Sequence, residues 1–238
     1  SGNALVAIIV LVLIMVFLFR EGAGFMPMYQ NSLELYRKAG LEYVDIMKGQ
    51  LERHRSYGQQ FNLVQLSMSD HFEKEGMSRE EARRATSQIE GMKQEFLELA
   101  TPQRELSDRL VDRVVEVRNQ EVNNENLRKA IEVFEKKGDE ETANQAREGI
   151  EEPDYEVLHS ELAETVLPYK AMNLSVGYHI GFLMDRPVTL PNPESRKAWN
   201  ELRSDIAAYV EAIPEYGQRL ETWDPDKKVP LTRGLTAF

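Results

Sequence analysis

The sequence predicts an all-α protein in which a single N-terminal transmembrane helix is followed by an extramembrane bundle of about five to seven helices and an extended C-terminal arm. Three observations predict this fold. Residues 4–19 are uninterruptedly apolar, apolar residues recur at spacings of three and four over most of the remaining chain, and the C-terminal residues have no helical period. We therefore divide the chain into an anchor with a helix breaker (1–27), an acidic helical domain (28–222) and an arm (223–238).

The anchor reads ALVAIIVLVLIMVFLF and contains no charge, no polar side chain, no Gly and no Pro. At about 1.5 Å per residue, such a helix covers roughly 24 Å, close to the roughly 30 Å hydrocarbon core of a bilayer. The cation that follows it can extend its charged end to the headgroups. The residues that we assign to the membrane anchor are Ala4, Ile8, Val12, Met15, Phe19 and Arg20.

Two other interpretations of this segment are a cleaved signal peptide and a buried core helix. Gly22 and Gly24 give a pattern like that of a cleavage site, but no basic region precedes Ala4, as a signal peptide requires. Basic residues lie only after the segment, starting with Arg20, and their bias predicts a single-pass membrane protein with a cytoplasmic body. A periplasmic body is the alternative.

The composition restricts the classes of partner. The chain has 238 residues with 29 basic and 40 acidic side chains, a net charge of −11. So negative a surface repels phosphate backbones, which argues against nucleic-acid binding. The absence of Cys excludes disulfides, thiol catalysis and Cys-ligated metals.

The first half of the body has clear helix signals. A helical pattern starts at residue 30 and is resumed after Gly58 until Gly76 closes it. Ser78 and Glu81 then form a capping box, and it precedes the most regular apolar stripe of the chain, over residues 82–99.

The next helix is predicted to start at Thr101-Pro102, an N-cap followed by proline in the first turn. The polar run NQEVNNEN (119–126) leaves two alternatives, a long helix that protrudes from the core or a break. Gly138 after two lysines marks the end of this helix, and Asp139 caps a short polar one.

The second half of the body is expected to contain the most buried helix. Pro168 separates an amphipathic helix at 155–167 from the apolar segment 169–184, which we expect either in the centre of the body or against a partner. Lys170, Asn173 and His179 argue against a second membrane span, and His179 is expected to be a hydrogen-bonded core histidine. A helix restarts at Asn192-Pro193 and is expected to stop before Pro214.

The arm contains two prolines and no helical period, which is typical of an extended segment. We predict that it docks onto a partner protein. The residues assigned to this docking arm are Trp223, Pro225, Pro230, Leu231, Leu235 and Phe238.

No catalytic constellation is recognised. Glu156 and His159 match one E-x-x-H element of di-iron bundles, but those sites need two, and no second one occurs. Phosphate-binding loops, a nucleophile elbow and a calcium loop are also absent from the sequence. We therefore predict no enzyme activity, no metal, no cofactor and no small-molecule substrate.

Two functions from different classes remain. The first is a structural or accessory subunit of a multi-subunit membrane complex, such as a photosynthetic or respiratory one, with the lipid bilayer and other protein subunits as partners. The second is a membrane-anchored helical module that recruits a soluble partner for binding or signalling. A helical enzyme with an unrecognised site is a third and weaker hypothesis. No motif identifies a family.

Overall fold

The computed structural model describes residues 31–227, and this part of the chain contains helices and no strands. The all-α prediction is confirmed for it. Residues 31–38 are helical and precede eight labelled helices: α2 (Leu41–Lys74), α3 (Arg79–Ala85), α4 (Ser87–Glu98), α5 (Thr101–Lys137), α6 (Glu140–Glu148), α7 (Tyr155–Glu164), α8 (Val166–Met184) and α9 (Pro193–Glu221).

The predicted membrane anchor at 4–19 lies outside the described residues. Within residues 31–227, none of the helices is both long and apolar enough to cross a bilayer. This agrees with the expectation that the segment 169–184 is not a second span.

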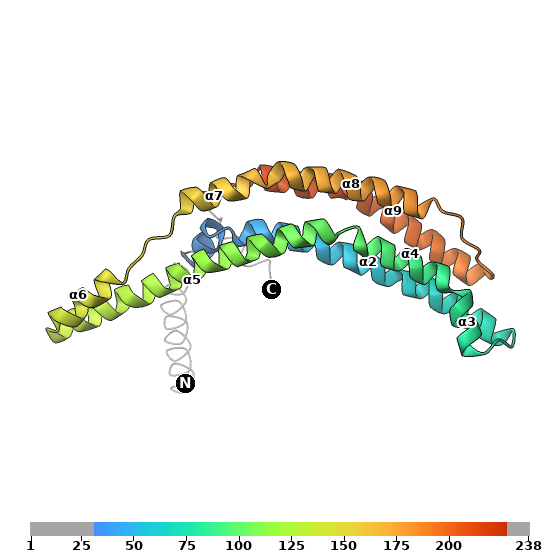
Figure 1. Cartoon of the computed structure of the whole chain (residues 1–238), viewed down its shortest axis with the longest axis horizontal. Coiled ribbons are helices and arrows are strands. Elements are labelled where there is room, and N and C mark those ends of the chain that lie inside the picture. The colour runs from blue at the N-terminus through green and yellow to red at the C-terminus, as the bar shows by residue number, and fades with distance from the viewer. Residues whose placement is uncertain (1–30, 228–238) are drawn as a thin grey trace, which may run out of the picture.

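The helices form a long crescent rather than a compact bundle (Figure 1). One layer contains α2 beside α4 and the first half of α5, and the other contains α7, α8 and α9. α9 packs against both α2 and α8 and joins the layers. α6 folds back against the far half of α5 and forms one tip of the crescent, and α3 lies at the other tip (Figure 1).

Two apolar cores lie along the crescent. One joins the C-terminal half of α2 with α4, α8 and the first part of α9, around Phe61, Phe96 and Ile206. The other joins the start of α2 with α5, α7 and the end of α9, around Tyr43 and Leu162. Because neighbouring helices share these cores, the crescent is held along its length by side-chain burial.

The glycines of α2 have two different structural roles. Gly40 ends the preceding helical turn with φ 81°, a left-handed conformation that favours glycine. Gly58 does not interrupt α2: a Cβ there would lie 2.4 Å from Leu97 Cδ2, so glycine allows α2 and α4 to approach closely. The helical pattern on both sides of Gly58 therefore belongs to one helix of 34 residues.

The predicted caps are largely confirmed. Ser78 and Glu81 form the capping box, Gly138 ends α5 with φ 75°, and the Asp139 carboxylate accepts from Thr142 N–H at the start of α6. Thr101 is the exception, because it is the first residue of α5 and makes no cap hydrogen bond through its side chain.

The apolar stripe at 82–99 and the polar run at 119–126 can be compared with the helices predicted for them. The stripe at 82–99 is split between α3 and α4 at the buried Thr86, whose hydroxyl donates to Arg83 O at 3.1 Å. The polar run at 119–126 does not break α5, which is continuous over 37 residues. The alternative of a protruding long helix is therefore the one observed.

The sequence-based prediction of a helix boundary at Pro168 and at Pro214 is wrong in both cases. Pro168 is the third residue of α8 and does not separate two helices. Proline is tolerated in the first turn of a helix, because the N–H groups there have no partner within the helix. Pro214 lies inside α9, which continues to Glu221. The preceding residue Ile213 and Gly217, three residues after the proline, are buried, and this packing maintains the helix across the missing hydrogen bond.

Candidate functional site

The interior contains a layer of hydrogen-bonded polar side chains contributed by α2, α5 and α8. Asn173 Oδ1 accepts from Gln50 Nε2 at 2.9 Å and from Gln103 Nε2 at 2.6 Å. Tyr169 OH donates to Gln50 Oε1 at 2.6 Å, and Asn173 Nδ2 lies 3.4 Å from the carbonyl of Ile213. All four polar side chains are buried.

The polar side chains of this layer hydrogen-bond mainly to one another. The acceptor of Asn173 and the donors of Gln50 and Gln103 are engaged with one another, and burial raises the pKa of Tyr169 above its ordinary value. A neutral network with its groups already paired fixes how the helices are aligned, because a shift of any helix would leave buried donors unpaired.

His54 forms a second buried polar connection, between α2, α4 and α9. Its Nε2 lies 2.7 Å from the carbonyl of Phe96, so Nε2 carries the proton, and Nδ1 accepts from Tyr209 OH at 3.3 Å. The imidazole stacks on the Phe96 ring at 4.2 Å. Burial lowers the pKa of His54 to about 4, which keeps the ring neutral at physiological pH.

A surface pocket of about 330 Å³ lies beside His54, between α2 and the α4–α5 junction. Arg55 and Arg104 line it with Glu52, so its rim is charged. Both nitrogens of His54 are used within the protein, and they are therefore not free to bind a ligand in this pocket.

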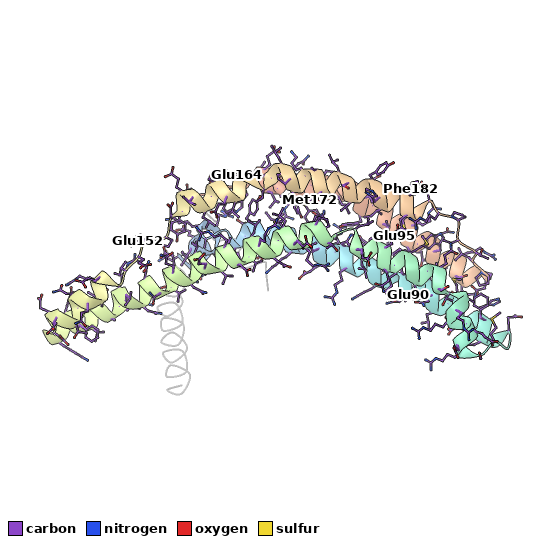
Figure 2. All side chains as sticks on the ribbon, in the orientation of Figure 1. Glu90, Glu95, Glu152, Glu164, Met172 and Phe182 are labelled. Carbon is purple, nitrogen blue, oxygen red and sulfur yellow. The ribbon has the colours of Figure 1, made fainter. Side chains whose placement is uncertain are left out.

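The outer face of α8 is the largest departure from the expected burial. Leu167, Leu174, Tyr178 and Phe182 are 74%, 71%, 73% and 66% exposed, so α8 is not the most buried helix. Only one side of it faces the core, through residues such as Val176 and Ile180. Figure 2 shows side chains projecting from this outer edge, with Phe182 near the C-terminal end of α8.

His179 also lies on this outer face, and the expectation of a core histidine is wrong. It is exposed, and its Nδ1 lies 2.7 Å from Ser175 O one turn earlier in the helix. The expectation failed because α8 is apolar on both sides, so its sequence does not indicate which side is buried.

Two ion pairs lie beside the outer face of α8, and Glu164, about one turn before Leu167, is exposed at its N-terminal end. Lys170 pairs with Glu221 at 3.1 Å and Arg203 with Asp185 at 3.3 Å. A pocket of about 180 Å³ opens next to Leu174 and is lined in addition by Lys170, Asn173, Pro214, Gln218 and Glu221. The face therefore combines apolar side chains and a small hollow, with an acidic residue at each end, Glu164 and Asp185.

The start of the predicted docking arm packs on the body. The Trp223 ring lies 5.3 Å from that of Tyr43 and 5.7 Å from that of His159, and Arg37 donates to the carbonyl of Lys227. Pro225 follows Trp223 in a turn. Four predicted arm residues lie outside the described part of the chain, as do all the anchor residues: Pro230, Leu231, Leu235, Phe238, Ala4, Ile8, Val12, Met15, Phe19 and Arg20.

His159 of the E-x-x-H element is engaged in a hydrogen bond to the backbone. His159 Nε2 lies 2.7 Å from the carbonyl of Lys38, which it therefore donates to. Within residues 31–227, no group of three or more metal-ligating side chains comes together.

Sequence reasoning missed the polar layer and the environment of His54. One signal was present, because Asn173 interrupts an otherwise apolar helix, and a polar residue in such a position requires a buried partner. Its partners Gln50 and Gln103 lie far away in the sequence and could not be identified.

No protein-family model, no curated protein and no solved structure matches this chain.

Proposed function

We propose that this chain is a non-catalytic structural or accessory subunit of a multi-subunit membrane complex, tethered to the bilayer by the apolar segment at 4–19. The observation that carries the proposal is the uncharged apolar run of this segment, joined to a body with a net acidic charge. Photosynthetic and respiratory complexes are examples of such assemblies. The body is proposed to lie on the cytoplasmic side.

Two features of the body support a role in assembly. The buried polar side chains of the layer around Asn173 bind one another, so they are used for alignment of the helices. Its α8 presents large apolar side chains outward, and exposed apolar patches of this kind are typical of protein-binding surfaces.

Substitution of Val10 by Arg tests the membrane tether. A cation at the centre of a span costs about 2.5 to 3.5 kcal/mol on insertion scales, so the variant is expected to lose carbonate-resistant membrane association or to stop accumulating. Val10→Leu is the matched control and is expected to remain in the membrane. Unchanged carbonate resistance of Val10→Arg would contradict the proposal.

Purification in mild detergent followed by mass spectrometry tests the role as a fixed subunit. A subunit is expected to co-purify with other chains in constant stoichiometry, whereas a recruitment module would be isolated alone. Deletion of residues 224–238 is expected to weaken this assembly and to leave the helicity of the body unchanged, because Trp223 and its contacts remain.

A further inference from the structure

The start of the C-terminal arm is tied to the helical residues 31–38, which follow the proposed membrane anchor in the chain. Arg37 lies in this helix, is 6% exposed, and donates through Nη1 to the carbonyl of Lys227. Its Nε and Nη2 bind the Glu42 carboxylate at 2.5 Å and 3.0 Å. Because such a two-point pair fixes the plane of the guanidinium, Arg37 holds Lys227 at a defined place.

Aromatic contacts hold the preceding part of the arm against the same end of this helix. The Trp223 ring meets those of Tyr43 and His159 edge-on, and His159 donates to the carbonyl of Lys38. The chain therefore leaves the described body at Lys227, directly beside residues 37 and 38.

The charge of the chain changes sign at this point. The last acidic residue is Asp226, and residues 227–238 contain three cations, Lys227, Lys228 and Arg233, in a chain of net charge −11. Segments that combine basic and large apolar side chains are typical of the surface of anionic bilayers. The large apolar side chains of this stretch are Val229, Leu231, Leu235 and Phe238.

We propose that residues 227–238 bind the anionic lipid headgroups of the bilayer beside the anchor, and that Arg37 positions them there. The inference rests on the proposed function, because the tether and the cytoplasmic orientation bring the arm to a leaflet that carries anionic lipids. It assigns the arm to the bilayer surface in place of the partner protein predicted from the sequence. A second contact of this kind fixes how the body is oriented on the membrane, so its loss weakens the assembly as well.

The lengths of chain on the two sides of this junction agree with such a contact. Residues 20–30, between the apolar run and the first described helix, and residues 228–238 of the arm have equal lengths. At no more than about 3.6 Å per residue, each covers up to about 40 Å. Arg37 lies only about 9 Å along the helix from Asn31. The arm therefore has the length to reach the bilayer surface from which residues 20–30 emerge.

Carboxylates near the start of the arm are fewer than its cations. The pKa of Arg37 is raised mainly by its hydrogen bond to Glu42 and in part by the charge of Asp224, so the Asp224 carboxylate lies near a cation of the body. Asp226 is the other acidic residue of the arm, against three cations. Acidic residues of the body more than about 8 Å from the headgroups are screened at physiological ionic strength. The arm therefore keeps a positive charge next to the lipid.

A fluorescent label in the arm tests the contact, since the natural chain contains no Cys. The full chain with Leu235→Cys is labelled with NBD, a dye whose emission rises in apolar surroundings, and is reconstituted in nanodiscs. The emission is expected to be at least threefold higher with phosphatidylglycerol than with phosphatidylcholine alone. This difference is expected to vanish at about 1 M salt, where charges are screened beyond about 3 Å. Leu63→Cys, at an exposed position on α2, is the control and is expected to give equal emission in both lipids.

Neutralisation of the arm tests the role of its charge. The variant Lys227→Gln/Lys228→Gln/Arg233→Gln removes the cations and keeps the Lys227 carbonyl that Arg37 binds. Each cation is worth about fivefold in binding to an anionic surface, so the binding constant of the arm is expected to fall on the order of a hundredfold. The measurement is the label emission as the phosphatidylglycerol content of the nanodiscs is raised.

The matched control removes three exposed cations from the first half of α9, with Arg196→Gln/Lys197→Gln/Arg203→Gln. These positions lie more than about 25 Å along α9 from Glu221, where the arm begins, so the binding constant is expected to change less than twofold. An equal loss in both triple variants would assign the effect to the net charge of the chain and would overturn the inference.

Arg37→Gln tests the positioning. The variant is expected to increase amide exchange at residues 224–227 at least tenfold and to lower the binding constant of the arm several-fold, because the start of the arm is no longer held beside the anchor. Far-UV circular dichroism checks that the body stays helical, and the triple variant of the arm tests the contact without a change at the buried Arg37. An unchanged binding constant in a folded Arg37→Gln chain would refute the role of Arg37.

The outcomes separate this inference from the proposed function. A label at residue 235 that does not respond in a carbonate-resistant chain would refute the bilayer contact and leave the tether standing. A label that responds in a chain that carbonate extracts would support the contact and refute the tether. A photo-cross-linker at residue 235 that captures a co-purifying subunit, together with an unresponsive label, would assign the arm to a protein and overturn the inference.

Discussion

At the scale of single residues, His54 makes the stability of the body dependent on pH. Its pKa is about 4 in the folded chain, against about 6.5 for an exposed histidine. Between pH 6.5 and pH 4 the unfolded chain therefore binds a proton that the folded chain does not, and the free energy of unfolding falls as the pH is lowered. From pH 7.5 to pH 5 this group alone is expected to cost about 2 kcal/mol.

The measurement is urea unfolding followed by circular dichroism at the two pH values. His54→Gln removes the titrating ring and keeps an N–H that can donate to Phe96 O. Between pH 7.5 and pH 5, the free energy of unfolding of this variant is expected to fall by about 2 kcal/mol less than that of the natural chain. An equal pH dependence in both proteins would show that His54 does not titrate as its burial requires.

Gly40 is a second residue whose role is local and testable. Its φ of 81° disfavours any L side chain, and a Cβ there would lie 2.8 Å from Leu162 Cδ1 and 2.9 Å from Val114 Cγ1. Gly40→Ala is expected to lower the free energy of unfolding by about 2 kcal/mol or more, from strain and overpacking together.

Gly49→Ala is the matched control for this substitution. Gly49 is inside α2, has no atom within 4 Å of the position that a Cβ would take, and is expected to gain up to about 1 kcal/mol from the better helix former. If Gly40→Ala left the free energy of unfolding unchanged or raised it, neither strain nor overpacking would act at Gly40.

At the scale of elements, the sequence predicted those helix ends whose signals are local. Ser78 with Glu81, Gly138 and Asp139 all act within a few residues of the ends that they define, so the pattern of residue types was sufficient. Pro214 was misread because the packing that maintains α9 comes from other helices: Ile213 belongs to the core shared with α2, α4 and α8, and Gly217 lies against Lys170 of α8.

The burial of α8 shows where local reasoning reaches its limit. An apolar helix can be buried on all sides or can leave one side for a partner, and the sequence left both alternatives open. Only the arrangement of α9 and α2 decides which side is covered. The polar layer around Asn173 was not predictable for the same reason, because its partners come from α2 and α5.

The α5–α6 tip is the element that we expect to be least stable. The far half of α5 is largely polar and packs mainly against the short α6, while Asn124 ties the α6–α7 connection to α5 by donating to Glu151 O at 2.7 Å and accepting from Glu151 N–H at 3.2 Å. Asn124→Ala is expected to increase amide hydrogen exchange at least tenfold around residues 149–154 and in α6.

The control for this prediction is its neighbour, Asn123. Asn123 is exposed on α5, so Asn123→Ala is expected to leave exchange at residues 149–154 unchanged. Equal effects of the two substitutions would mean that the Asn124 side chain does not hold the connection.

At the scale of the whole molecule, the crescent follows from how the helices share their cores. Each apolar core joins only part of α2 and α9, and α5 extends past both cores to meet α6. Long helices that overlap over part of their length produce an extended body with a large surface, which suits a protein that contacts other chains. The same arrangement leaves the middle of α8 at the convex edge (Figure 1).

Small-angle neutron scattering in contrast-matched detergent tests this shape. A compact domain of 238 residues has a radius of gyration of about 18 Å. The 37 residues of α5 alone extend over about 55 Å, and α4 continues the same layer, so the radius of gyration is expected to be on the order of 25 Å. A value near 18 Å would mean that α5 and α6 fold back onto the bundle, and it would contradict the extended crescent on which the assembly role depends.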